Sequence, residues 1–91
     1  MIKKLSLLVV FGLLSSCTNK VTTQCTDKPK EQWQDQAEFQ ASLEENGYQI
    51  NRFKVTDGNC YEIYGFNSED QKVEVYFNPV DGSVVKEEIE E

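Results

Sequence analysis

The stretch that decides the fold is residues 60–78, CYEIYGFNSEDQKVEVYFN. Cys60–Phe66 and Lys72–Asn78 are rich in aromatic and β-branched residues, and the polar run Asn67–Asp70 between them predicts a turn. In the second segment, apolar residues alternate with residues that carry a polar group: Val73, Val75 and Phe77 alternate with Lys72, Glu74 and Tyr76. Successive side chains of a strand point to opposite faces of its sheet. The stretch therefore predicts two antiparallel strands with one apolar face.

The flanking segments extend this pattern in both directions. Tyr48–Val55 predicts an earlier strand with Phe53 and Val55 on one face, and Asp57-Gly58 after it is a strong hairpin signal. On the other side, Pro79–Gly82 predicts a further turn, and Ser83–Val85 a short fourth strand. Lys86–Glu91 is an acidic run at the end of the sequence, and we expect it to fray.

A helix is predicted before the strands, over Gln36–Asn46. Asp35 and Glu38 fit a capping box, Phe39 and Leu43 lie one turn apart, and Gly47 suits the end of a helix. We expect Trp33 to pack just before the helix, and an earlier start near Pro29 and Glu31 stays open. The expected fold class is α+β: one N-terminal helix packed on a three- to four-stranded antiparallel meander sheet.

The first 17 residues resemble a bacterial lipoprotein signal. Lys3 and Lys4 precede the apolar run Leu5–Leu14, and small residues lead to Cys17. A membrane-spanning helix needs about 20 apolar residues, so this run is too short to be one. The resemblance implies removal of residues 1–16, acylation of Cys17 and anchoring outside the cytoplasm. Thr18 after the Cys implies the periplasmic side of the outer membrane, if the host has one.

Charge and cysteine content narrow the function classes. Without residues 1–16, seven Lys and Arg stand against 16 Asp and Glu, giving a net charge of 7 − 16 = −9. This balance argues against nucleic-acid binding, which needs clustered cations. In an oxidising compartment Cys25 and Cys60 predict a disulfide. The alternative is a two-Cys metal site, but the chain has no His to complete zinc coordination. The expected organisation is a signal peptide (1–16), a lipidated Cys and tether (17–24), a domain (25–85) and an acidic tail (86–91).

Several motifs in order make the domain similar to a PepSY domain. They are Trp33, Gly47-Tyr48, Asp57-Gly58, Cys60-Tyr61-Glu62-Ile63, Asn78-Pro79 and Asp81-Gly82. The resemblance covers about Cys25–Val85 and is to the small secreted branch with a paired Cys. Asn67–Asp70 departs from it by lacking a Gly, which affects the expected turn type. PepSY domains occur in propeptides of thermolysin-like metalloproteases, so the resemblance implies restraint of a peptidase and brings no catalytic residues.

No catalytic or cofactor motif is evident in the sequence. Without His there is no Ser-His or Cys-His pair, there is no Gly-rich phosphate loop, and we expect neither a cofactor nor a metal. Adjacent carboxylates such as Glu44-Glu45 and Glu87-Glu88 are interpreted as solvated surface.

The candidate binding residues are Tyr64, Phe66, Arg52 and Lys54. Tyr64 and Phe66 share a strand face opposite Tyr61 and Ile63, and Arg52 and Lys54 belong to a strand that can accept a peptide if it forms an edge. The favoured function is a membrane-tethered, non-enzymatic domain that binds an envelope protein, in particular a peptidase. The alternatives are a structural envelope lipoprotein and a lipoprotein that binds a small ligand or metal.

Overall fold

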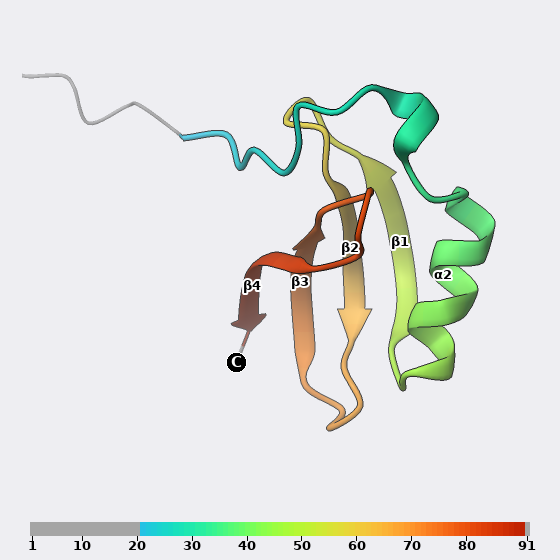
Figure 1. Cartoon of the computed structure of the whole chain (residues 1–91). Coiled ribbons are helices and arrows are strands. Elements are labelled where there is room, and N and C mark those ends of the chain that lie inside the picture. The colour runs from blue at the N-terminus through green and yellow to red at the C-terminus, as the bar shows by residue number, and fades with distance from the viewer. Residues whose placement is uncertain (1–20, 91) are drawn as a thin grey trace, which may run out of the picture.

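The computed structural model describes residues 21–90 (Figure 1). The predicted signal peptide 1–16 and Cys17 lie outside the described residues. One α-helix and one four-stranded antiparallel sheet make up the described fold, so the α+β class is confirmed. The elements in chain order are η4 (Lys30–Gln32), α2 (Gln36–Glu45), β1 (Gln49–Val55), β2 (Tyr61–Phe66), β3 (Lys72–Phe77) and β4 (Val84–Glu90).

Helix α2 begins where the capping pattern predicts it. The Asp35 side chain accepts a hydrogen bond from the Glu38 backbone N–H at 3.0 Å, which satisfies one of the free donors at the helix start. Gly47 follows the helix with φ +99°, a conformation that favours glycine. The expectation of an N-terminal helix needs correction, because the single 3₁₀ turn η4 precedes α2. Its N-cap is Pro29, whose fixed φ suits a helix start.

The sheet order is β1-β2-β3-β4, with every neighbouring pair antiparallel. The strands thus form the predicted meander, joined by short turns. The first turn contains Gly58, which is buried. A Cβ there would lie 1.8 Å from the carbonyl oxygen of Thr23, so this glycine allows the amino-terminal segment to approach the hairpin.

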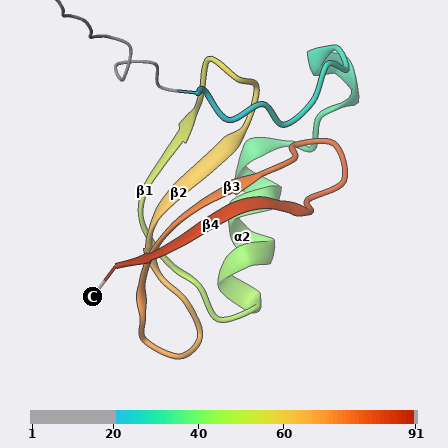
Figure 2. The same ribbon diagram turned by 90° about the vertical axis from the view of Figure 1, so that its left-hand side faces the viewer.

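The core lies between α2 and one face of the sheet, and Figure 2 shows the helix behind the strands on that face. The ring of Phe39 contacts the rings of Tyr61 and Phe77, with centroid distances of 5.1 and 5.2 Å. The buried set is Phe39, Leu43, Tyr61, Ile63, Val73, Val75 and Phe77, and Trp33, Tyr48, Ile50 and Phe53 pack against it. The apolar side chains predicted from period-two alternation are therefore the ones that the helix covers.

The prediction that Lys86–Glu91 frays is wrong for residues 86–90. They belong to β4, which spans Val84–Glu90 and pairs with β3 along its length. The strand forms because β3 offers a row of backbone hydrogen-bonding groups that need a partner, whatever side chains the partner carries. All seven β4 residues are exposed, so its carboxylates stay in water, and Lys72 Nζ lies 3.8 Å from Glu90 Oε1.

Cys25 and Cys60 are bonded, as the sequence predicts, with their Cα atoms 5.0 Å apart. The segment before the bond follows the β1–β2 hairpin closely. The Cys25 N–H donates to the Gly58 carbonyl at 3.0 Å, and the Thr23 carbonyl oxygen lies 3.5 Å from Cys60 Sγ. Part of the predicted tether thus packs on the domain.

Candidate functional site

The face of the sheet opposite α2, here called the open face, carries polar and charged side chains. Its membership follows from the strand alternation and the register of the pairs. It consists of Arg52 and Lys54 from β1, Glu62, Tyr64 and Phe66 from β2, Lys72, Glu74 and Tyr76 from β3, and Lys86, Glu88 and Glu90 from β4. No described helix covers this face, so it is the natural candidate for a binding surface.

Two carboxyl groups meet at the middle of the open face. Glu62 pairs across the strands with Tyr76, and Glu74 with Tyr64, so the two glutamates are diagonal neighbours that share a hydrogen bond. Glu62 is only 1% exposed, and its Oε2 is buried without a donor among the described residues. The Tyr76 hydroxyl donates to Glu74 Oε2 at 2.8 Å.

The two carboxyl groups have opposite electrostatic environments. Burial, and then the hydrogen bond with Glu74, raise the pKa of Glu62, although Lys54 Nζ lies 3.8 Å from its Oε1. The hydrogen bond from Glu62 lowers the pKa of Glu74. A buried ionised carboxylate with an unpaired oxygen is costly, whereas a protonated Glu62 becomes a donor to the Glu74 carboxylate. This environment favours the protonated form of Glu62 and the ionised form of Glu74.

The neighbouring tyrosines respond to the same negative charge. The hydrogen bond with Glu62, followed by burial, raises the pKa of Tyr64 to about 12. Burial, and then the hydrogen bond to Glu74, raise the pKa of Tyr76 as well. Both hydroxyls thus remain protonated donors at neutral pH and stabilise the carboxyl pair.

A hollow of about 280 Å³ lies beside the carboxyl pair, under the amino-terminal segment. Its lining consists of Val21, Thr22, Thr23, Lys54, Thr56, Asp57, Glu62, Tyr76 and Lys86. Glu62 contributes to its floor but is almost fully shielded, so it is poorly placed to exchange protons with a bound molecule. The arrangement favours a structural role for the carboxyl pair over an acid–base role.

The four predicted binding residues all lie on the open face, and their roles stay predictions. The guanidinium of Arg52 stands 5.9 Å from the centre of the Tyr64 ring, within cation–π range. Lys54 faces Glu62. Phe66 is half-buried at the other end of β2. The structure thus brings Arg52, Lys54 and Tyr64 together and leaves Phe66 apart from them.

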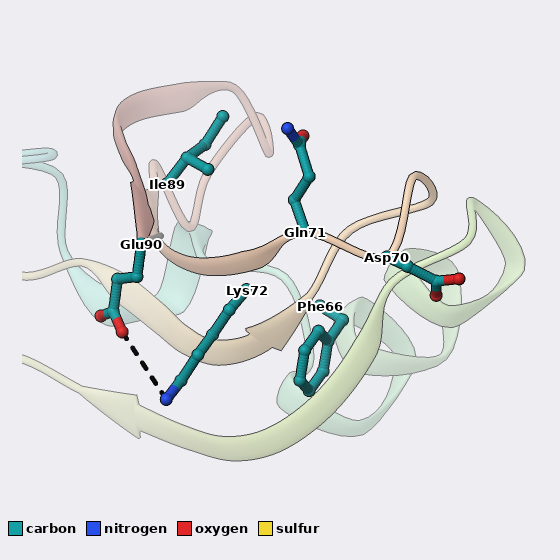
Figure 3. Close-up of a pocket in the computed structure, with 6 residues that line it drawn as sticks. All are labelled: Phe66, Asp70, Gln71, Lys72, Ile89 and Glu90. Atoms are coloured by element: carbon teal, nitrogen blue, oxygen red, sulfur yellow. Dashed lines mark ion pairs between the residues drawn. The ribbon is translucent and has the colours of Figure 1, made fainter.

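Phe66 borders a second hollow of about 540 Å³, shown in Figure 3. Phe66, Lys72 and Glu90 lie on one side of the sheet there, whereas Ile89 and Gln71 point to the other side. Asp70 points away from the rest. These side chains do not converge on one point, so this hollow offers no set of ligands for a small molecule.

Within residues 21–90 no group of three or more His, Cys, Asp or Glu side chains is arranged to hold a metal ion. None of the described helices is long and apolar enough to cross a bilayer.

Sequence reasoning missed Glu62, Glu74 and Tyr76 as members of one cluster. It considered carboxylates that are adjacent in sequence, whereas these two are twelve positions apart and meet only through the β2–β3 register. The available signal was the alternation itself. Once Ile63 and Val75 are assigned to the apolar face, the glutamate preceding each of them must lie on the other face.

Comparison with known proteins gives one match. The family model described as peptidase propeptide and YPEB domain, PepSY_2, matches residues 5–88. No curated protein and no solved structure matches the chain. The match covers the whole folded unit up to the middle of β4.

Proposed function

We propose, because the chain belongs to the PepSY family of peptidase propeptide and YPEB domains, that it is a non-enzymatic protein-binding domain that restrains an envelope peptidase. The family match is the observation that carries this proposal. The proposal includes cleavage before Cys17, acylation of Cys17 and attachment to the membrane outside the cytoplasm. In a host with an outer membrane, the attachment is to its periplasmic side.

The two edges of the sheet support a protein-binding role. Among the described residues, β1 and β4 each pair on one side only, so each presents unpaired backbone groups that can accept an extended peptide. The edges differ in charge. β1 carries Arg52 and Lys54 and no acidic residue, whereas β4 carries Lys86 against Glu87, Glu88 and Glu90. β1 therefore suits an acidic partner segment and β4 a basic one.

The test uses a secreted form, residues 18–91, which contains every described residue. We expect it to slow cleavage of a casein substrate by peptidases extracted from the native envelope, and immobilised protein to retain at least one of them at low salt. A Leu43→Asp variant, whose core cannot form, is the matched control. Unchanged peptidase activity with no retained protein would contradict the proposed function.

A structural envelope lipoprotein is the second candidate, and one observation favours it. Each edge strand has an irregularity in its register, between Ile50 and Arg52 on β1 and opposite Tyr76 and Phe77 on β4. Bulges of this kind interrupt an edge and discourage strand addition. In that case the secreted form retains no specific protein, and deletion of the gene alters envelope integrity without altering proteolysis.

The lipid anchor has an independent test. Mass spectrometry of the amino-terminal peptide from the native envelope is expected to show cleavage before Cys17 and a diacylglycerol on its sulfur. A Cys17→Ser variant should leave the membrane fraction. An intact Met1 start, or an unmodified Cys17 thiol, would contradict this part of the proposal.

A further inference from the structure

Strand β4 is the more open of the two sheet edges. Within residues 21–90 it pairs with β3 alone, and both views show no other described element along its outer side (Figures 1 and 2). All seven of its residues are exposed. After the irregularity at its start, the register is regular from Lys86 to Glu90. This gives a straight run of five residues for a partner strand.

The pairing pattern identifies the free backbone groups of β4. The Asn67 N–H donates to the Gln71 carbonyl at 2.9 Å, so 67 and 71 form a hydrogen-bonded pair. Such pairs alternate along an antiparallel ladder. The residues of β3 that bond toward β4 are therefore Lys72, Glu74 and Tyr76, opposite Glu90, Glu88 and Lys86. Glu87 and Ile89 consequently direct their N–H and C=O groups outward.

The side chains of β4 combine apolar surface with negative charge. Val84, Val85 and Ile89 are 51%, 43% and 48% exposed. Among residues 21–90 only Val21 and Val55 are other large hydrophobic residues with such exposure. With one Lys and three Glu, the strand has a net charge of 1 − 3 = −2. A partner strand that matches this edge must offer apolar and basic side chains.

We propose that the outer edge of β4 binds an extended, basic segment of a partner protein as a fifth strand of the sheet. The inference rests on the proposed protein-binding function and names the surface and the partner chemistry. Apolar side chains of the segment cover Val85 and Ile89, and its Lys or Arg side chains face Glu87, Glu88 and Glu90. Main-chain hydrogen bonds to Glu87 and Ile89 supply the remaining binding interactions.

A second copy of this chain is a poorer occupant. Two β4 strands paired about a two-fold axis through Glu87 would set that carboxylate against its own copy and combine two strands of charge −2. The β1 edge of another copy carries Arg52 and Lys54, but its register shifts just before Arg52, which leaves four regular residues. The whole chain has a net charge of −7, which opposes both arrangements.

The experiment measures binding of a defined probe to the mature chain in detergent micelles. The probe is a fluorescein-labelled peptide of alternating Val and Lys residues, with a Val and Glu peptide as the charge-reversed control. We expect saturable binding of the Val/Lys peptide that weakens with salt, and none of the Val/Glu peptide. Absence of Val/Lys binding, or equal binding of both peptides, would overturn the proposal.

Two proline variants locate the binding edge. Glu87→Pro removes an outward N–H and leaves the ladder bonds to β3, so we expect affinity to fall about tenfold or more. Glu87→Gln keeps the N–H and should lose much less. Val55→Pro removes an outward N–H on β1, because Thr56 and Cys60 form the hydrogen-bonded pair next to it. It should bind as the parent does. Equal affinity for Glu87→Pro, or a loss for Val55→Pro, would overturn the assignment to β4.

Two further measurements keep the result interpretable. If Glu87→Pro fails to fold, amide hydrogen exchange is measured on the parent protein instead. We expect peptide binding to slow exchange at Glu87 and Ile89. Unchanged exchange at both residues would contradict the proposal. Analytical sedimentation tests whether two copies of the chain associate. Self-association that Glu87→Pro abolishes would show that the occupant of β4 is a second copy and not a separate partner.

Peptide binding without peptidase restraint would refute only the proposed function. Peptidase restraint that survives Glu87→Pro would refute only the β4 inference.

Discussion

The two faces of the sheet bury their central residues by different means. On one face, Ile63 and Val75 are covered by Phe39 and Leu43 of a helix. On the open face, Glu62 is just as buried, yet no described helix covers it, and its neighbours there are side chains such as Lys54 and Tyr76. The first arrangement depends on filled volume, whereas the second depends on hydrogen bonds and charges among polar side chains. We therefore expect the first face to respond to changes in packing and the second to changes in pH.

The largest expected loss of stability comes from removing the disulfide, which holds the amino-terminal segment against the sheet. The Cys25–Cys60 bond closes a loop of 35 + 1 = 36 residues, so replacing both cysteines by Ser should lower the free energy of unfolding by roughly 4 kcal/mol. Urea denaturation with and without reductant measures this. The reduced parent serves as the control and should match the double variant. A loss below about 1 kcal/mol would show that the bond contributes little.

Loss of packing on the helix-covered face comes next. Leu43 is 7% exposed, and Leu43→Ala should cost about 3 kcal/mol, because the removed side chain leaves a cavity between helix and sheet. The cost should be the same at acidic and neutral pH, because the core cluster around Leu43 contains no Asp, Glu, Lys or Arg. Ala41→Ser, on the exposed side of the same helix, is the matched control. A pH-dependent loss for Leu43→Ala would break the distinction between the faces.

The pH response should come from the open face. Folding raises the pKa of Glu62, so its contribution is complete below the unfolded pKa and disappears as pH rises through the folded value. Folding lowers the pKa of Glu74, so its contribution disappears as pH falls through the folded value. Stability should therefore peak between the two values. We expect an effect smaller than that of Leu43→Ala.

Glu62→Gln tests the origin of this pH response. The amide keeps a donor for Glu74 without an ionisable proton, so the loss of stability on the alkaline side should disappear in chemical denaturation at a series of pH values. Lys54, Tyr64 and Tyr76 also surround the pair and remain unchanged in this variant. Glu45→Gln, on exposed helix surface, should keep the parental profile. A parental profile for Glu62→Gln would assign the response to another group.

The smallest expected effect tests the hydrogen bond to the carboxyl pair. Tyr76→Phe removes the donor that lies 2.8 Å from Glu74 Oε2 and should cost about 1 kcal/mol. It should also raise the pKa of Glu74, measurable by NMR titration of its side-chain carboxyl. Tyr48→Phe, on the other face, should leave that pKa unchanged. An unaltered Glu74 titration in Tyr76→Phe would show that this bond does not hold the pair.

The fold was predictable wherever local pattern and tertiary structure agree. Asp35 with Glu38 located the helix start, and Ile63, Val73 and Val75 revealed the apolar face by alternation alone. Strand β4 was not predicted in full, because Lys86, Glu87 and Glu88 look like a solvated tail and become a strand only through pairing with β3. Long-range pairing of this kind leaves little trace in a short window of sequence.

The candidate site was less predictable than the fold. The sequence predicts Tyr64, Phe66, Arg52 and Lys54 as candidate binding residues, and the strand register places them on one face. The carboxyl pair depends on a diagonal contact between β2 and β3, and the hollow beside Glu62 depends on Thr23 and its neighbours in the amino-terminal segment. Neither is visible in the order of residues, because both require the strand register and the path of the segment before Cys25.

The disulfide also decides how tension travels through the molecule. A pull applied on the amino-terminal side reaches Cys25 and passes through the sulfur–sulfur bond to Cys60, one residue before the inner strand β2. Residues 26–59, with η4, α2 and β1, lie inside the covalent loop and carry none of this load. A membrane anchor at Cys17 would therefore pull on the middle of the sheet, next to β2, rather than directly on either edge strand.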